Sequence, residues 1–166
     1  MTIPLKQNSF IIIDHINMNF NKNITNISYT LQNDGIHSTL INLTIETFYE
    51  VVKSRITGSI NFPENDRDRE YKRQYFKTSL DTARLLKGAF GNSITKALAQ
   101  KILETKNLTI PLKKGFYYFY DFSIPDIFLP FGSPSRALIK CVYDGKIKRE
   151  KKTVLGSSWE FFIHRI

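Results

Sequence analysis

The sequence predicts a single, mainly β domain with one short helical segment. Apolar and polar residues alternate over long stretches, and turn-forming residues separate these stretches, as expected for strands. The spacing of short amphipathic helices occurs only near the middle of the chain, over about residues 79–105. The 166 residues, 42% of them hydrophobic, are enough for one core, and no linker or repeat divides them. We therefore expect one domain over residues 1–166.

The first half of the chain shows four strand patterns followed by a charged loop. The strands are predicted over residues 9–20, 24–31, 38–49 and 51–62. The third is the clearest, because Ile41, Leu43 and Ile45 alternate with polar residues, as in a strand with one buried face. Residues 63–73 are charged without an apolar period, which predicts an exposed loop.

Two short helices are expected in the middle of the chain. Ser79 or Asp81 is suited to cap the first helix, and Asn92 or Ser93 is suited to begin the second. The second helix has an apolar face made of Ile94, Ala97, Leu98 and Ile102. The simplest interpretation of such a face is that the helix packs on the sheet.

Strand patterns return in the last third of the chain, and one of them is unusually aromatic. Residues 116–124 carry six aromatic side chains over both faces, which indicates burial on both sides or one face lining a cavity. Residues 136–143 predict a further strand, with Asp144-Gly145 as its hairpin turn and the basic residues 146–153 as a returning edge strand. A final strand is predicted over residues 159–166.

The chain is strongly basic, with 24 Lys and Arg against 15 Asp and Glu and a net charge of +9. This excess favours an anionic partner such as a lipid headgroup or a membrane surface, although a basic solvated surface explains it equally well. A binder of single-stranded nucleic acid needs aromatic side chains interleaved with cations. Here the densest aromatic residues (116–122) and the densest cations (146–152) lie on different segments, so we expect no nucleic-acid partner.

No residue pattern typical of catalysis is present. The chain has no P-loop, no dinucleotide-binding glycine pattern and no nucleophile elbow. His15, His37 and His164 lack the spacing of metal ligands, and Cys141 lies inside a strand pattern, where a structural thiol is expected. We therefore expect a protein that is not an enzyme and uses no metal or cofactor.

Signals for localisation point in two directions. Because Cys141 is the only cysteine, no internal disulfide can form, which by itself favours a reducing compartment. Residues 1–6 lack the apolar run of a signal peptide, which fits an intracellular chain or one in which Met1 replaces a removed signal. Secretion is favoured by glycosylation acceptors at Asn23, Asn26, Asn42 and Asn107.

The most specific motif lies in residues 110–130. It reads Ile110-Pro111-Leu112-Lys113-Lys114-Gly115-Phe116-Tyr117, followed by Phe122-Ser123-Ile124-Pro125-Asp126-Ile127-Phe128-Leu129-Pro130. This resembles a Cys-Pro-x-Lys-x-Gly-x-Tyr segment followed by Pro-Asp-x-x-Leu-Pro, as found in the ML lipid-recognition superfamily, in the ganglioside activator protein and its insect chemosensory-protein-B-type relatives. Residues 79–86 similarly resemble the insect proteins' Asp-x-Cys-x-x-Leu block. Ala83 and Ile110 stand where those proteins have cysteines.

The resemblance implies an immunoglobulin-like antiparallel β-sandwich, opened as a β-cup around an apolar cavity. It also implies a secreted protein that binds, solubilises or presents a lipid or hydrophobic semiochemical, with a role in chemosensation. If Ala83 and Ile110 replace a disulfide, their Cα atoms should lie about 4.4–6.8 Å apart. The alternative is a protein–protein interaction module on the same sandwich, with side chains filling the cavity; a basic nucleic-acid-binding domain ranks below it.

We expect apolar side chains from three segments to line the cavity and two lysines to meet a headgroup. The predicted apolar lining is Phe90, Ile94, Leu98, Phe122, Ile124, Phe128 and Phe131. Lys113 and Lys114 are the predicted headgroup ligands because they directly precede the aromatic strand. A membrane surface or a receptor protein are further expected partners.

Overall fold

The computed structural model describes residues 9–88, 93–103, 108, 111–129, 132–148 and 152–166, without the side chains of residues 98, 101–103 and 127. The described strands are β1 (Ile11–Phe20), β2 (Thr25–Gln32), β3 (Leu40–Thr47), β4 (Val51–Phe62), β5 (Arg73–Asp81), β6 (Gly115–Phe122), β7 (Arg136–Ile147) and β8 (Val154–Arg165). Helical segments are α1 (Thr82–Leu86), α2 (Ser93–Leu103) and the single 3-10 turn η1 (Asp126–Phe128).

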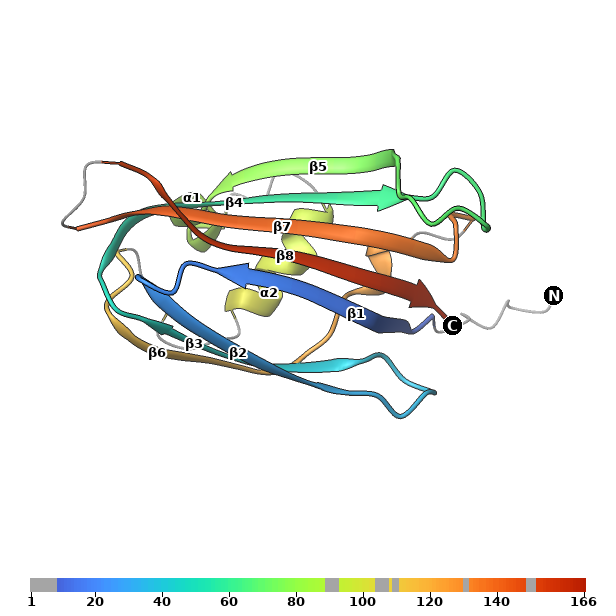
Figure 1. Ribbon diagram of the computed structural model, residues 1–166, viewed down its shortest axis with the longest axis horizontal. Coiled ribbons are helices and arrows are strands. Elements are labelled where there is room, and N and C mark those ends of the chain that lie inside the picture. The colour runs from blue at the N-terminus through green and yellow to red at the C-terminus, as the bar shows by residue number, and fades with distance from the viewer. Residues whose placement is uncertain (1–8, 89–92, 104–107, 109–110, 130–131, 149–151) are drawn as a thin grey trace.

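The strands form two antiparallel sheets that face each other (Figure 1). The larger sheet has the order β1-β8-β7-β4-β5 and the smaller has the order β2-β3-β6. A tight turn after Asn21 joins β1 to β2, so the chain passes directly from the edge of one sheet to the edge of the other. The prediction of a mainly β protein with two antiparallel sheets is confirmed.

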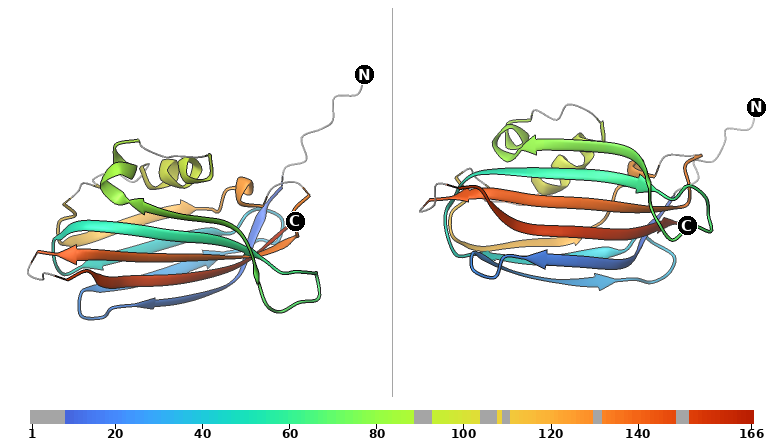
Figure 2. Two further views of the ribbon diagram at one scale, coloured as in Figure 1. Left: turned by 90° about the horizontal axis from the view of Figure 1, so that it is seen from above. Right: turned by 45° about the horizontal axis from the view of Figure 1, so that its top comes forward.

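The two α-helices lie together along one side of the sheets (Figure 2). Asp81 caps α1, since its carboxylate accepts hydrogen bonds from the backbone N–H groups of Ala83 and Arg84 at 2.9 and 3.2 Å. α1 packs on β4 and β5, and α2 contacts α1 and η1. Both α-helices fall within the predicted segment 79–105, which confirms that prediction.

One end of the sandwich is closely packed. The inward residues there are fully buried, because β1, β8, β7 and β4 place branched aliphatic side chains side by side. These residues include Ile11, Ile13, Ala137 and Ile163, with Leu129 beyond η1. We call this region the packed end.

Three details of the predicted strands are wrong. Asp144-Gly145 is not a hairpin turn, because both residues pair with β4 on one side and β8 on the other. Gly145 is instead needed for close packing, since a Cβ atom there would lie 3.0 Å from a methyl carbon of Val51. The predicted edge strand over residues 146–153 is also wrong, because Lys146 and Ile147 end the central strand β7 and the next described strand, β8, begins at Val154; residues 149–151 lie outside the described residues.

The third error is a missed strand, β5. The sequence predicted a loop up to residue 73, a helix cap at Ser79 or Asp81 and no strand between them, but residues 73–81 form an edge strand. Only Phe76, Thr78 and Leu80 turn inward, while exposed polar or charged residues flank them. Charges protect an exposed edge from pairing with other chains, and they also weaken the apolar pattern of the strand.

Candidate functional site

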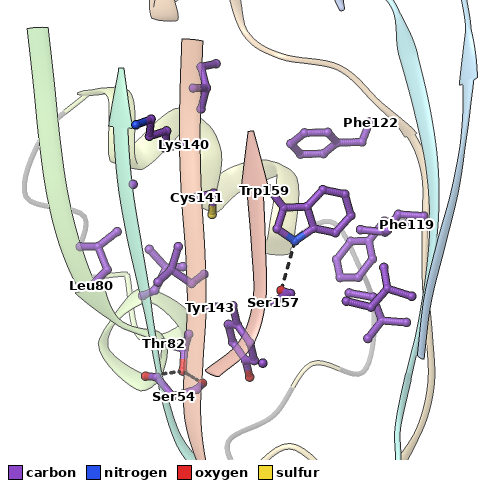
Figure 3. A pocket seen from close by; sticks show the side chains of 18 of the residues that line it. Ser54, Leu80, Thr82, Phe119, Phe122, Lys140, Cys141, Tyr143, Ser157 and Trp159 are labelled. Carbon is purple, nitrogen blue, oxygen red and sulfur yellow. Dashed lines mark hydrogen bonds between the residues drawn. The ribbon is translucent and has the colours of Figure 1, made fainter. Parts of the chain in front are cut away.

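The end of the sandwich opposite the packed end is hollow. A cavity of about 360 Å³ lies there between the two sheets (Figure 3). Its walls come from β2, β3 and β6 on one side and from β4, β5, β7 and β8 on the other, and α1 and α2 line it as well. We call this region the hollow end.

Side chains that point between the sheets at the hollow end are only partly buried. Ile45, Ile56, Leu80 and Phe119 line the cavity and retain intermediate exposure, unlike their counterparts at the packed end. A residue between two sheets keeps accessible surface only where space adjoins it. The half-buried state of these side chains is consistent with the cavity between the sheets, which they adjoin.

The cavity lining is almost entirely apolar and contains no inward-facing charge among the described residues. No Asp, Glu, Arg or His belongs to the described lining. Lys140 adjoins it, but its exposed side chain leaves β7 on the side opposite Cys141 (Figure 3). A charged group entering this space would lose its hydration without a compensating partner.

Hydroxyl groups gather at one end of the cavity, away from Phe122 (Figure 3). The hydroxyl oxygens of Ser54 and Thr82 lie 2.5 Å apart, and Thr82 Oγ1 also donates to the Ser54 carbonyl at 3.1 Å. Burial raises the pKa of the Tyr143 phenol, which lies close to Ser54, above its usual value. From the facing sheet, Tyr117 donates its hydroxyl hydrogen to the Lys113 carbonyl at 2.6 Å.

Two further polar side chains lie along the cavity. Trp159 stacks on Phe161 and donates its indole N–H to Ser157 Oγ at 3.1 Å, so its only donor is used within the protein. Burial raises the pKa of the Cys141 thiol to about 11. Such a thiol is neutral at physiological pH, which makes a nucleophilic role unfavourable.

The structure brings together four of the seven residues predicted to line a cavity. Ile94, Phe122, Ile124 and Phe128 all line it. Ile124 and Phe128 are fully buried and also belong to the core, so they lie where the hollow end meets the packed end. The other three predictions, Phe90, Phe131 and the side chain of Leu98, lie outside the described residues, as does the expected contact of Ala83 with Ile110.

The predicted headgroup ligands lie beside the cavity rather than in it. Lys113 and Lys114 are exposed in the turn before β6 and are not part of the cavity lining. The backbone of Lys113 is nevertheless held by Tyr117, which does line the cavity. Contact between these lysines and a headgroup stays a prediction.

Most of the cavity wall from the larger sheet was missed by sequence reasoning. Ile56, Leu80, Tyr143 and Trp159 line the cavity, and none was predicted to do so. Their alternation with polar neighbours could have shown that they point inward. No sequence signal distinguishes an inward residue in a packed core from one in a cavity wall.

β6 presents a second aromatic surface, on the face away from the cavity. Phe116, Tyr118 and Tyr120 are exposed there, and their near-parallel rings have centroids 6.3 and 6.0 Å apart. The sequence left two interpretations of this strand open, burial on both faces or one face lining a cavity. The structure supports the second. The opposite face is not buried.

Of the predicted glycosylation acceptors, Asn23 and Asn26 are exposed, whereas Asn42 is half-buried. Asn42 also accepts a hydrogen bond from the Asp121 backbone N–H at 2.9 Å. Asn107 lies outside the described residues.

Among the described residues, no group of three His, Cys, Asp or Glu side chains is placed to hold a metal ion. His37 and His164 are paired with Asp34 and Asp14, at 2.6 and 2.8 Å.

No helix in the described part of the chain is long and apolar enough to span a bilayer. Comparison with known proteins finds no protein-family model and no curated protein that matches the chain.

Proposed function

We propose that the protein binds an apolar small molecule in the hollow end and acts as a carrier rather than an enzyme. The observation that carries this proposal is the cavity of about 360 Å³, walled by apolar side chains from both sheets. Small-molecule sites typically measure about 300–1,000 Å³ and combine an apolar lining with a few polar groups. The hydroxyl cluster at one end of the cavity supplies such groups.

Burial of ligand surface is sufficient to drive this binding. Each methylene group transferred from water into the cavity contributes roughly 0.8 kcal/mol, so an alkyl chain needs no reactive partner in the protein. The cavity is also preformed by the two sheets and the helices, so little ordering of the protein opposes binding. The net charge of +9 would favour approach to anionic membranes that hold such ligands.

An immunoglobulin-like β-cup of the ML type accommodates this proposal. That resemblance implies two antiparallel sheets around an apolar cavity, and the two facing sheets with a cavity between them support the proposal. With this fold, the role that we propose is that of a secreted carrier of a lipid or semiochemical that serves chemosensation. The exposed acceptors Asn23 and Asn26 fit passage through a secretory pathway.

Ligand binding can be tested with Trp159, the only tryptophan of the chain, which lines the cavity. An apolar fluorescent probe such as N-phenyl-1-naphthylamine should bind at one site and accept excitation energy from Trp159. Unlabelled alkyl ligands should displace it. Absence of probe binding by the folded protein, together with no lipid retained in native mass spectrometry, would exclude the carrier function.

A second candidate function is protein–protein interaction through the outer face of β6. The specific observation is the row of exposed rings of Phe116, Tyr118 and Tyr120. Exposed aromatic clusters are enriched at interaction sites. This function does not require an empty cavity, so it would remain if the probe fails to bind.

A further inference from the structure

Ser157 is a buried hydroxyl group in the wall of the cavity, and its hydrogen has no acceptor among the described residues. The residue is 5% exposed and lines the cavity between Tyr143 and Trp159 (Figure 3). Its oxygen accepts the indole N–H of Trp159 at 3.1 Å. A serine hydroxyl also carries one hydrogen of its own, which no hydrogen bond within the described part of the chain uses. This hydrogen is available to a group inside the cavity.

The position of this hydroxyl group is fixed by a bulge in β8. The pairing of β7 with β8 shifts next to the pair formed by Tyr143 and Ser157, which leaves Gly156 as an extra residue. The Gly156 carbonyl accepts a hydrogen bond from the Asn21 backbone N–H at 2.9 Å. A Cβ atom at Gly156 would lie 2.9 Å from Cδ1 of Tyr143, so this ring packs directly on the bulge. A donor held in this way loses little freedom when a ligand binds.

Other hydroxyl groups of the cavity wall are used within the protein or are less deeply buried. Thr82 donates to the Ser54 carbonyl at 3.1 Å, and Tyr117 donates to a backbone carbonyl at 2.6 Å. Thr78, on the edge strand β5, and the Tyr143 phenol can donate, but both residues are only half-buried. An unpaired donor costs most free energy where it is fully buried, so a ligand that pairs with Ser157 gains most.

We propose that the cavity holds an uncharged ligand by a carbonyl oxygen, as in a ketone, an aldehyde or an ester, and that Ser157 donates the hydrogen bond. The inference rests on the proposed function. The alkyl part of the ligand would lie along Phe119 and Trp159 toward Phe122 (Figure 3). A carbonyl group needs only a donor, whereas an alcohol brings a hydrogen that needs an acceptor as well. A carboxylate would bring a charge into a space with no inward-facing cation among the described lining residues.

The hydrogen bond can be observed directly on the unmodified protein. 2-Nonanone labelled with carbon-13 at its carbonyl carbon is bound, and its carbonyl stretching band is isolated by isotope-edited infrared spectroscopy. A carbonyl oxygen that accepts a hydrogen bond absorbs at lower frequency than the same carbonyl in hexane. We therefore expect the bound ketone to absorb below its frequency in hexane.

A variant of Ser157 identifies the donor. Ser157→Cys fills the same space, but its thiol is only a weak donor and a weak acceptor. The band should move back toward its frequency in hexane, and 2-nonanone should compete with N-phenyl-1-naphthylamine about two- to tenfold more weakly, the effect of one net hydrogen bond. 2-Methyl-1-nonene, in which a methylene group replaces the carbonyl oxygen, should compete equally with both proteins.

The control variant is Ser158→Cys, on the next residue of β8. Ser158 is half-buried and is not part of the cavity lining. Its replacement should leave the band and the affinities of both ligands unchanged. A reducing agent keeps Cys141 and the introduced thiols from forming disulfides.

The outcomes separate the inference from the proposed function. A band at its hexane frequency in the unmodified protein, or a band and an affinity that Ser157→Cys does not alter, overturns the inference and leaves the carrier function standing. An equal loss for the ketone and the alkene also overturns it, because the effect is then one of shape. Failure of both ligands and of the probe to bind overturns the carrier function itself. If Ser157→Cys does not fold, the band in the unmodified protein still decides.

Discussion

The packed end and the hollow end share strands β4, β7 and β8, yet only one of them is filled. At the packed end the inward positions carry branched aliphatic residues such as Ile11, Ile13 and Ile163, each about 1% exposed. At the hollow end β4 and β8 instead place small residues inward, including Ser54, Gly58 and Ser157, beside larger half-buried ones. Small side chains between sheets about 10 Å apart leave volume that no neighbour fills.

This difference indicates that stability and ligand binding are assigned to opposite ends of one sandwich. The packed end buries the apolar surface that stabilises the fold, while the hollow end keeps apolar surface available for a ligand. A substitution of one kind should therefore have different consequences at the two ends.

The largest expected effect is the loss of stability when an isoleucine is shortened at the packed end. Ile163→Ala should lower the free energy of unfolding by about 2–5 kcal/mol, because it opens a cavity in a filled core. Ile45→Ala, which only enlarges an existing space, should cost clearly less. Urea denaturation followed by Trp159 fluorescence measures both. Equal losses would contradict the distinction between the two ends.

Cys141 tests whether the hollow end is shielded from bulk water. With its pKa raised from 9.0 to about 11, the thiolate fraction at pH 8 is roughly a hundredfold lower than for an unperturbed cysteine. Alkylation by iodoacetamide should be slow in the folded protein and accelerate as pH rises toward 11. The thiol of the unfolded chain loses its proton at lower pH than the buried thiol does. The stability of the fold should therefore fall as the pH rises from about 9 to 11 and stay lower above that range.

A bound ligand should slow this alkylation further, since Cys141 lines the cavity. The control is the same reaction in urea, where the cysteine should react as a free thiol does. Rapid alkylation of the folded protein at pH 8 would show that the thiol is in contact with bulk water.

Filling the hollow end should separate binding from stability. Ile45→Trp adds volume on the cavity side of β3 and should abolish probe binding with little change in the melting temperature. Thr44→Trp, on the opposite face of the same strand, should leave probe binding intact. At the packed end, Ala137→Leu should cost about 1–3 kcal/mol through overpacking. If Ile45→Trp destabilises as much while the probe still binds, the hollow end is a packed core.

Apart from β5, the sequence predicted the described strands of both sheets, but it did not predict the difference between the two ends of the sandwich. Alternation predicts which residues point inward, and it correctly assigned the inward face of β3. It says nothing about what lies opposite, because the facing residues come from distant parts of the chain. Gly145 shows the same limit: the dipeptide Asp144-Gly145 is typical of a turn, yet the glycine is needed for contact with Val51.

A bulge explains why the inward residues of β6 were difficult to predict. Tyr117 and Phe119 face the cavity, and so does Phe122, which simple alternation would place on the other face. The register of β6 against β3 shifts between Phe119 and Phe122, and Asp121 has a φ of 54°. The extra residue returns Phe122 to the inner face. The bulge lies where β6 passes from the hollow end toward the packed end.

The smallest expected effect comes from substituting Asp121 within this bulge. Asp121→Val should destabilise the protein by about 1–2 kcal/mol, because a β-branched residue adopts positive φ with difficulty. Asp121→Gly should be neutral or slightly stabilising, since glycine adopts this conformation without strain. Tyr120→Val is the matched control at an exposed position of the same strand and should change stability by no more than about 0.5 kcal/mol. Thermal unfolding of the three variants gives the ranking. If valine and glycine at position 121 prove equally stable, the bulge does not hold Phe122 toward the cavity, and β6 must pass between the two ends in another register.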